Sequence, residues 1–435
     1  MYQYYDLDEL YWDEEGTMDM SFGEEYKKNQ LNTEYATPKY IASDERIIKL
    51  ANMIVDEAIE NQSTDIQLMA VNDQWGIIRL RVGTEMRAYR KVHGQAMAAL
   101  AIVFKSMSRV NIDENQREQG GRFTHTYLNE SYDLRTSFMP TIKGESVSIR
   151  VLYSSSLESD IADLGFPPYV LKSIRQVLQL SEGLILLTGG TGSGKTTTMY
   201  TGINDILRRS QGTKNVITIE NPVEYVIEGA VQSQVDNLRG YTFAKGLQTS
   251  LRQNPDVLLV GEINDQETAE TAVRASTSGH LVFSTLHAND VLGTTQAMEH
   301  YKVSPFQLSW ALQLVLNQKL PNKLCPHCKK LKMVNTEEMN WIKTLGTDER
   351  LLSVYERVGC EDCAWFGYLG RVLVVGMLDA NEAYTRIAVK GLPLLDMERE
   401  LMEDPDARYY PMRKDVFRHL KEGSIDLLTA QGIMR

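Results

Sequence analysis

The sequence of 435 residues lacks several features that would each indicate a different class of protein. No apolar run approaches the ~20 residues that a membrane-spanning helix needs, and the acidic N-terminus does not follow a signal-peptide pattern. Basic residues do not dominate, because 46 Lys and Arg stand against 58 Asp and Glu and the net charge is -12. This balance argues against a large sequence-independent nucleic-acid surface. We therefore expect a cytoplasmic protein without a transmembrane segment and without direct nucleic-acid binding.

Cysteine is also scarce, and all four cysteines fall into two C-x-x-C pairs, so none remains for a disulfide framework or a lone nucleophile. Two such pairs in a cytosolic chain are typical of a closed structural Zn²⁺ site with four thiolate ligands. Two separate redox pairs would need a thioredoxin-like context, which is missing. The sequence therefore predicts a zinc subdomain over residues 322–370, with the ligands Cys325, Cys328, Cys360 and Cys363.

Glycine, in contrast, is concentrated in one stretch that follows the apolar run 183–188 and precedes a helix-like segment. The pattern G-x-x-x-x-G-K-T in this setting predicts a loop whose backbone N–H groups hold the phosphates of ATP or GTP. Lys195 would reach the β- and γ-phosphates, and the Thr196 hydroxyl would bind Mg²⁺. The predicted nucleotide-binding residues are Gly189, Gly190, Thr191, Gly192, Ser193, Gly194, Lys195, Thr196 and Thr197.

The chain divides by pattern into several parts. Residues 1–40 are acidic and lack a sustained period, which favours a flexible tail; an alternative is a short docking segment around Trp12. Residues 41–153 mix helical and strand patterns and predict a small α+β domain. Residues 154–160 are a predicted linker, and 161–435 alternate strands and helices as in a mostly parallel α/β sheet. Within this last part, residues 376–435 have a helical and charged pattern, with predicted helices at 392–401 and 416–428.

Three predicted strands of the α/β part end in a chemically active side chain. Glu220, Glu262 and His287 follow the apolar runs 216–219, 256–260 and 281–285. Active groups gather at the carboxyl ends of parallel strands. Glu262 would order Mg²⁺, Glu220 would orient or deprotonate a water, and His287 would lie near the γ-phosphate. Each taken alone could be a surface carboxylate or a core histidine.

The chain resembles the secretion ATPases that power type II secretion and type IV pilus assembly. Four ordered segments carry the resemblance, which extends over residues 43 to about 375: the phosphate loop 189–196, then 217–224, 251–265 and 277–289. The resemblance implies a RecA-like P-loop ATPase core, a small α+β (PAS-like) N-terminal domain and a homohexamer with ATP bound between the two domains. It also implies Glu262 as the Walker B acid, Glu220 as the catalytic acid and His287 near the γ-phosphate.

The resemblance further implies that Arg135 and Arg150 of the N-terminal domain are arginine fingers. The tetracysteine insert resembles the branch that extends pili or secretes, since retraction motors typically lack it. The implied partners are a polytopic inner-membrane platform protein and a cytoplasmic adaptor, which would hold the chain at the inner membrane. A DNA-transfer ATPase, a retraction motor and a nucleotide-gated scaffold with decayed catalysis remain alternatives. The scaffold alternative is motivated by two departures from the family pattern, because this chain has Asn221 where the family has Asp and Asn264 where it has Arg. Two further departures are Gln248, where the family has Arg, and Gln67, where it has His.

Overall fold

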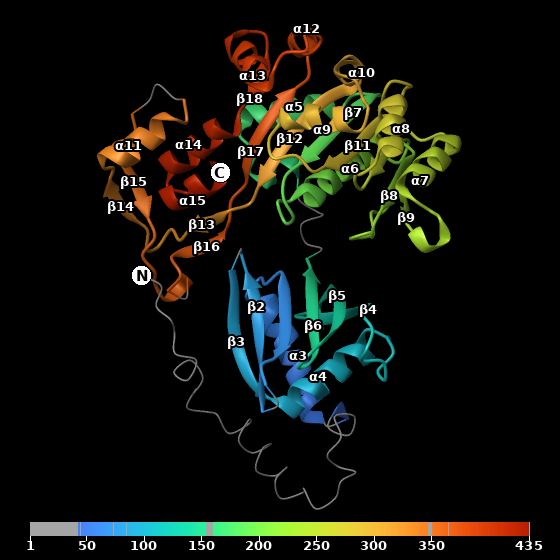
Figure 1. Cartoon of the computed structure of the whole chain (residues 1–435), viewed down its shortest axis with the longest axis vertical. Coiled ribbons are helices and arrows are strands. Elements are labelled where there is room, and N and C mark those ends of the chain that lie inside the picture. The colour runs from blue at the N-terminus through green and yellow to red at the C-terminus, as the bar shows by residue number, and fades with distance from the viewer. Residues whose placement is uncertain are drawn as a thin grey trace, which may run out of the picture. The chain divides into compact units, whose positions relative to one another are not determined.

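The computed structural model describes residues 42–434 except 44, 73, 84, 154–159, 347–349 and 364. The predicted acidic segment 1–40 and all but the last residue of the predicted linker lie outside the described residues. The chain forms two compact units, Met1–Ser154 and Ser155–Arg435 (Figure 1).

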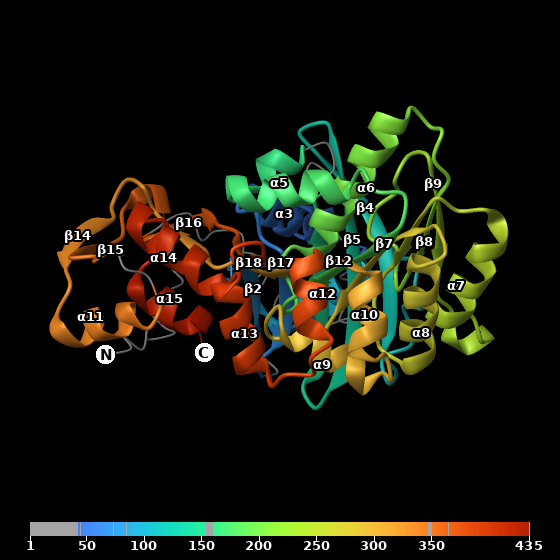
Figure 2. The ribbon, with the colours of Figure 1, turned by 90° about the horizontal axis from the view of Figure 1, so that it is seen from above.

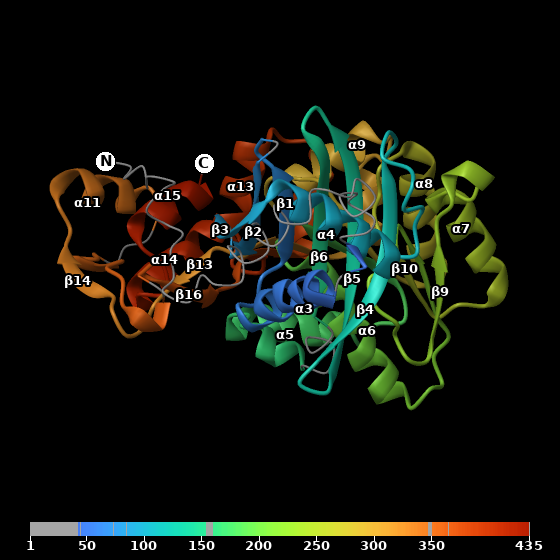
Figure 3. The same cartoon turned by 90° about the horizontal axis from the view of Figure 1, so that it is seen from below.

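The first unit is a six-stranded antiparallel sheet with two helices on one face (Figure 3). Helix α3 forms because apolar residues recur every three or four positions and bury one stripe against the sheet. The strand order is β3-β2-β1-β6-β5-β4. The elements are α3 (Glu45–Glu60), β1 (Asp65–Ala70), β2 (Trp75–Val82), β3 (Glu85–His93), α4 (Gly94–Met107), β4 (Gln119–Tyr127), β5 (Glu130–Thr141) and β6 (Gly144–Leu152). The predicted α+β class of this part is confirmed.

The second unit contains an eight-stranded sheet in the order β18-β17-β12-β7-β11-β10-β8-β9. The strands from β12 to β9 run parallel, and β17 and β18 join the β12 edge antiparallel. The strands are β7 (Gly183–Thr188), β8 (Val216–Glu220), β9 (Ala230–Gln234), β10 (Val257–Val260), β11 (Leu281–Leu286), β12 (Leu312–Lys319), β17 (Val374–Asp379) and β18 (Arg408–Tyr410). The predicted mostly parallel α/β core is confirmed.

Helices cover both faces of this sheet (Figure 2). The central strands are buried along nearly their whole length, and their successive side chains enter two different cores. One core contains α5 (Pro168–Val177) and α6 (Lys195–Ser210). The other contains α7 (Phe243–Ser250), α8 (Gln266–Ser276), α9 (Gly293–His300), α10 (Pro305–Ala311), α12 (Glu382–Ala388) and α13 (Leu394–Glu403). Short 3₁₀ turns are η3 (Ile161–Leu164), η4 (Asn237–Arg239), η5 (Leu251–Gln253) and η6 (Glu361–Cys363).

A smaller cluster of elements lies beside the sheet and contains the cysteines (Figure 2). Its strands pair as two separate ribbons, β13 with β16 and β14 with β15. A third apolar core joins this cluster to the last two helices of the chain. The elements are β13 (Asn322–Leu324), β14 (Lys330–Met333), α11 (Thr336–Lys343), β15 (Ser353–Glu356), β16 (Tyr368–Arg371), α14 (Met412–Glu422) and α15 (Leu427–Met434).

The C-terminal part differs from the sequence prediction in two ways. Residues 376–435 are not wholly helical, because most of β17 and all of β18 lie in this range and extend the main sheet. The predicted helix 416–428 is also divided into α14 and α15. Gly423 ends α14 with φ +65°, and a Cβ at this position would lie 2.3 Å from the Tyr355 ring. Only glycine tolerates this conformation and this close approach.

Candidate nucleotide and metal sites

The predicted catalytic groups lie on neighbouring strands of the main sheet. The phosphate loop follows β7, His287 follows β11, Glu262 follows β10, and Glu220 is the last residue of β8. These four strands are consecutive and parallel in the sheet, so their carboxyl ends share one edge. Adjacent strands are about 4.8 Å apart, which puts the three side chains in a row that begins at the phosphate loop.

The phosphate loop needs glycine at both of its ends. At Gly189 (φ +132°) a Cβ would lie 2.3 Å from the carbonyl oxygen of Gln318. Gly194, the residue before α6, has φ +88° and a Cβ would lie 3.1 Å from Leu320. At Gly190 and Gly192 a Cβ would meet nothing within 4 Å. The loop is therefore tight where it joins β7 and α6 and open between them, as an anion-binding loop requires.

Lys195 lies at the first position of α6. Its Nζ donates to the carbonyl oxygens of Gly189 (2.8 Å) and Gly190 (2.9 Å), so the ammonium lies against the loop itself. Burial lowers the pKa of Lys195, and the negative charge of Glu262 acts in the opposite direction. The lysine and the strand-end carboxylate therefore influence each other electrostatically. The Asn264 amide donates to Glu262 Oε1 at 2.9 Å, so one departure from the family pattern contacts the acid directly.

Glu220 is held by hydrogen bonds rather than open to solvent, since only 4% of the residue is exposed. Its Oε1 accepts from Thr218 Oγ1 (2.6 Å) and Gln232 Nε2 (3.1 Å), and its Oε2 accepts from the Tyr200 hydroxyl. His287, in contrast, is exposed. The acid predicted from the sequence thus belongs to a buried polar network, and two of its members, Tyr200 and Gln232, lie outside the sequence motifs.

Strand β12 supplies two further supporting residues that sequence reasoning missed. Asn317 and Gln318 are fully buried polar side chains at the end of this strand. Asn317 Nδ2 donates to Thr188 Oγ1, and Gln318 Nε2 donates to Thr198 Oγ1, each at 2.9 Å. They hold the strand before the phosphate loop and the helix after it. Their only sequence signal is a polar pair after the apolar residues 314–316.

The first unit carries a row of arginines across its sheet. The register places Arg81, Asp65, Arg150, Arg135 and Arg122 directly opposite one another on β2, β1, β6, β5 and β4. Residues that pair in this way share one face. The buried positions of the strands alternate with these residues, so the row lies on the face opposite α3 and α4.

Asp65 organises one end of this row. Its carboxylate accepts from Arg150 Nε (3.1 Å) and lies 3.4 Å from Arg81 Nε. The Arg150 side chain is still 55% exposed. Arg122 pairs with Asp133 at 2.5 Å. The two arginines predicted as fingers are thus adjacent cross-strand neighbours, and Arg150 is held at Nε although more than half of its side chain is exposed.

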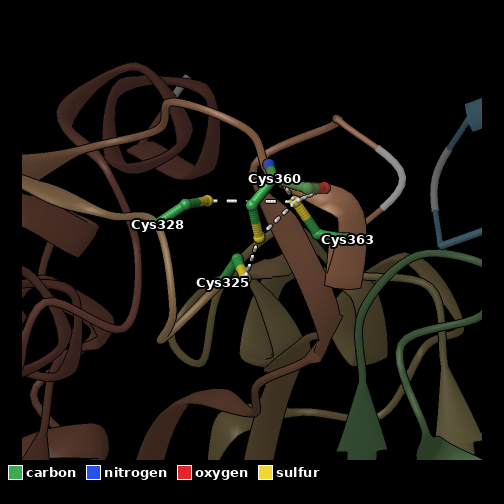
Figure 4. A group of neighbouring side chains, drawn as sticks. All are labelled: Cys325, Cys328, Cys360 and Cys363. Atoms are coloured by element: carbon green, nitrogen blue, oxygen red, sulfur yellow. Dashed lines mark hydrogen bonds between the residues drawn. The ribbon is translucent and has the colours of Figure 1, made fainter.

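The two C-x-x-C pairs meet in space, as Figure 4 shows. Their four sulfur atoms lie within 4.8 Å of one another, with separations of 3.9 Å (Cys325–Cys360), 3.8 Å (Cys328–Cys363) and 3.7 Å (Cys360–Cys363). Four sulfurs around one zinc ion at about 2.3 Å would be about 3.8 Å apart. The cluster therefore has the dimensions of a single four-thiolate metal site.

Backbone groups make the cluster suitable for thiolates. Burial raises the pKa of the Cys363 thiol, but N–H groups of Cys360 (3.3 Å) and Gly367 (3.2 Å) donate to its sulfur and outweigh burial, which lowers this pKa to about 7. The N–H of Gly359 donates to Cys328 Sγ at 3.3 Å, but burial prevails there and raises the pKa of Cys328, as it raises the pKa of Cys360 to about 12. Such donors favour the deprotonated sulfur that a metal ion requires. The residues present fit a metal ion.

Across residues 42–434, apart from the gaps noted above, no helix combines the length and the apolar character that crossing a membrane requires.

The parallel sheet with a glycine loop, a lysine at the head of α6 and an acid two strands away defines a P-loop ATPase with a tetracysteine insert. The profile of the family described as "Type II/IV secretion system protein" matches residues 41–423. The chain belongs to this family.

Two relatives are named for secretion and for pilus assembly. The type II secretion system protein E of Klebsiella pneumoniae is 37% identical over 372 residues, which are 85% of this chain and 72% of that protein. The type IV pilus assembly ATPase PilB of Myxococcus xanthus is 33% identical over 362 residues, covering 82% of this chain and 63% of its own length. The chain is therefore shorter than both relatives.

Solved structures agree on the fold. The pilus retraction motor PilT with bound ADP has a TM-score of 0.58 and 26% identity, over 88% of this chain and 96% of that one. The ATPase DotB of Legionella pneumophila has a TM-score of 0.65 and 19% identity, over 92% and 96% of the two chains. The second likeness concerns the fold alone.

Proposed function

We propose that this chain is the ATP-hydrolysing motor that drives assembly of a type IV pilus or of a type II secretion pseudopilus. The observation that carries the proposal is the 33–37% identity, over most of the chain, to relatives named for these two machines. In this proposal the chain works as a homohexamer in the cytoplasm, at the inner membrane. Its partners are a polytopic platform protein and a cytoplasmic adaptor.

The proposed chemistry assigns one role to each group at the sheet edge. The N–H groups of residues 189–197 and the Lys195 ammonium bind the phosphates of ATP. Thr196 and Glu262 hold Mg²⁺, which neutralises phosphate charge when bound. Glu220 orients the attacking water or accepts its proton, and His287 contacts the γ-phosphate. The order of these groups along the edge, beginning at the loop, supports this assignment.

Arg135 and Arg150 are proposed to stabilise charge on the phosphates during hydrolysis. Their adjacent cross-strand positions and the exposure of Arg150 support this role. We expect Arg150→Ala to lower kcat for ATP hydrolysis by on the order of 10²-fold, because each donor aimed at developing charge contributes about that much. Steady-state phosphate release would measure it, with the exposed cation Lys143 changed to Ala as the control. A wild-type kcat in Arg150→Ala would mean that Arg150 is an ordinary surface cation with no role in hydrolysis.

The four cysteines are proposed to hold one Zn²⁺. The ion would have a structural role, since four thiolates complete a tetrahedral shell and leave no position for a substrate. The sulfur separations near 3.8 Å support this ion.

A retraction motor is the second candidate function, favoured by the 26% identity to PilT over nearly its whole length. Electron microscopy of surface fibres on cells carrying Lys195→Ala, with secreted proteins assayed in the same cultures, separates the candidates. Cells without fibres would indicate a pilus-extension motor. Normal fibres with cargo retained in the periplasm would indicate a secretion motor. Excess fibres would indicate retraction and contradict the assembly proposal.

A further inference from the structure

We propose that Tyr200 is a positioning residue that fixes the Glu220 carboxylate for hydrolysis and links it mechanically to the phosphate-binding helix. This inference rests on the proposed function, because it takes Glu220 as the group that handles the attacking water. It adds a residue outside the sequence motifs, found only through the contacts of the folded chain.

The position of Glu220 in the sheet makes the contact with α6 necessary. Residues 216, 218 and 220 of β8 alternate with 217 and 219, so Glu220 and Thr218 point to the side that α6 covers. Tyr200 is fully buried on that helix, at 0% exposure. Its hydroxyl donates to Glu220 Oε2. A buried carboxylate without donors would be costly, so this network is what permits an acid at this depth.

The two oxygens of Glu220 are not equivalent. Oε1 accepts two hydrogen bonds, from Thr218 and Gln232, and a carboxylate oxygen has two lone pairs. Among the described residues, Oε2 accepts only from Tyr200. One lone pair of Oε2 therefore remains available as an acceptor. The hydrogen bond from the Tyr200 hydroxyl fixes the direction in which this lone pair points. A water that Glu220 orients would take this position.

The Gln232 side chain holds the other oxygen of Glu220, Oε1, and cannot rotate without losing several contacts. Its amide nitrogen donates to Glu220 and to the Tyr225 carbonyl (2.9 Å), and its oxygen accepts from the Ile227 N–H (2.6 Å). The loop after Glu220 is thereby tied to β9. Tyr200 is then the remaining donor that connects the carboxylate to the nucleotide side of the unit.

The Tyr200 hydroxyl is suited to this task. It donates to Glu220 and at the same time accepts the N–H of Glu224 at 3.3 Å, which holds the next acidic residue of the loop as well. The Tyr225 ring packs edge-on against the Tyr200 ring, with the two ring centroids 6.2 Å apart. Burial, and then the charge of Glu220, raise the pKa of Tyr200 above its ordinary value, so it remains a protonated donor throughout the physiological range.

The link to the phosphates follows from helix geometry. Lys195 and Tyr200 lie five residues apart on α6, a rise of about 7.5 Å along one rigid element. Any shift of the start of α6 when its N–H groups and Lys195 engage phosphate would move the Tyr200 hydroxyl with it. Phosphate binding and the orientation of Glu220 are thus coupled through one helix.

The test is Tyr200→Phe in the full chain, which removes the hydroxyl and keeps the ring. We expect kcat to fall by on the order of tenfold or more, since small misplacements of a catalytic group are costly. The KM for ATP and the affinity for a fluorescent ADP analogue should stay within about twofold, because Tyr200 does not touch the phosphate loop. The matched control is Tyr384→Phe. Tyr384 is also buried, and its hydroxyl has no hydrogen-bond partner among the described residues.

A second measurement separates positioning from a general structural role. In a Glu220→Gln background, Tyr200→Phe should change kcat by less than about twofold, because residues that act as a unit are not additive. An unchanged kcat in Tyr200→Phe would overturn the inference. So would a decrease in kcat that is as large in the Glu220→Gln background as in the wild type. A wild-type rate in Glu220→Gln alone would instead contradict the proposed role of Glu220.

A variant that fails to bind the ADP analogue would not test positioning. Thr218→Val then takes its place, because it removes a donor to Oε1 while nearly preserving shape. We expect it to lower kcat several-fold with ADP affinity unchanged, because it loosens the same carboxylate from its other oxygen. An unchanged kcat would mean that the orientation of Glu220 does not limit hydrolysis, which would overturn the positioning role of Tyr200.

Discussion

Lys195→Ala is expected to lower the rate of ATP hydrolysis by at least about 10³-fold. The substitution removes the one lysine of residues 189–197, which we propose to reach the β- and γ-phosphates, and electrostatic stabilisation of the transferring group dominates phosphoryl transfer. The fold should survive, because within the described part of the chain the amine bonds only to the carbonyls of Gly189 and Gly190, and Gly190 is exposed to water. Phosphate release and thermal unfolding would be measured on the same preparation.

Arg208→Ala is the matched control for this substitution. Arg208 is an exposed cation in the last turn of the same helix, far from the loop, and its loss should change neither rate nor stability noticeably. Equal background rates in the wild type and in Lys195→Ala would show that the wild type does not hydrolyse ATP. The chain would then be a nucleotide-gated scaffold with decayed catalysis.

Loss of the metal ion is the second prediction with a large effect. The purified chain should contain one zinc per molecule, and Cys325→Ser or strong chelation should remove it. Structural zinc in small domains contributes about 10–16 kcal/mol to folding, and the cysteine cluster has only a small apolar core of its own. We therefore expect local unfolding, seen as faster amide exchange over residues 322–371.

The last two helices should loosen together with the cysteine cluster. The N–H of Leu324 donates to Ser424 O (2.8 Å), Lys329 Nζ to Gly423 O (2.7 Å), and the Tyr368 hydroxyl to Asp426 (2.8 Å). Amide exchange over residues 412–434 should rise as well, while the strands β7, β10 and β11 stay protected.

The control for the metal site is His327→Ala. His327 lies inside the first C-x-x-C pair but is exposed and outside the cluster of sulfur ligands, so the variant should retain its zinc. Full metal content in Cys325→Ser, or unchanged exchange after chelation, would mean that the four cysteines do not form one structural site.

The sequence predicted the parallel strands well where a buried apolar run ended at a polar side chain, as at Glu220 and Glu262. It missed β12 as a strand, because residues 312–316, which include the polar Gln313, directly continue the short helix α10 and have no turn signal before them. The pairing of β17 with β12 could not be predicted from the sequence either, because strand order depends on contacts between residues distant in the chain.

The same distinction holds for the site. Glycines with positive φ and a following lysine form a local pattern, so the phosphate loop could be predicted residue by residue. Tyr200, Gln232 and Gln318 act through hydrogen bonds to other elements and have no spacing that marks them. A buried tyrosine in a helix is ordinary core in any sequence; only the fold shows that its hydroxyl meets a carboxylate.

The pairing of β12 with β17 has an evolutionary consequence. Lys319 and Val374 are register partners, so the chain leaves the sheet and returns to it at a single point. The residues between them, 320–373, are an excursion that a short turn could replace without altering the strand order. The apolar faces of α14 and α15 pack on that excursion, however, and would be left bare by its deletion. Ancestral gain or loss of the cysteine module therefore requires a matching change in the C-terminal helices, and the two segments should be inherited as a pair.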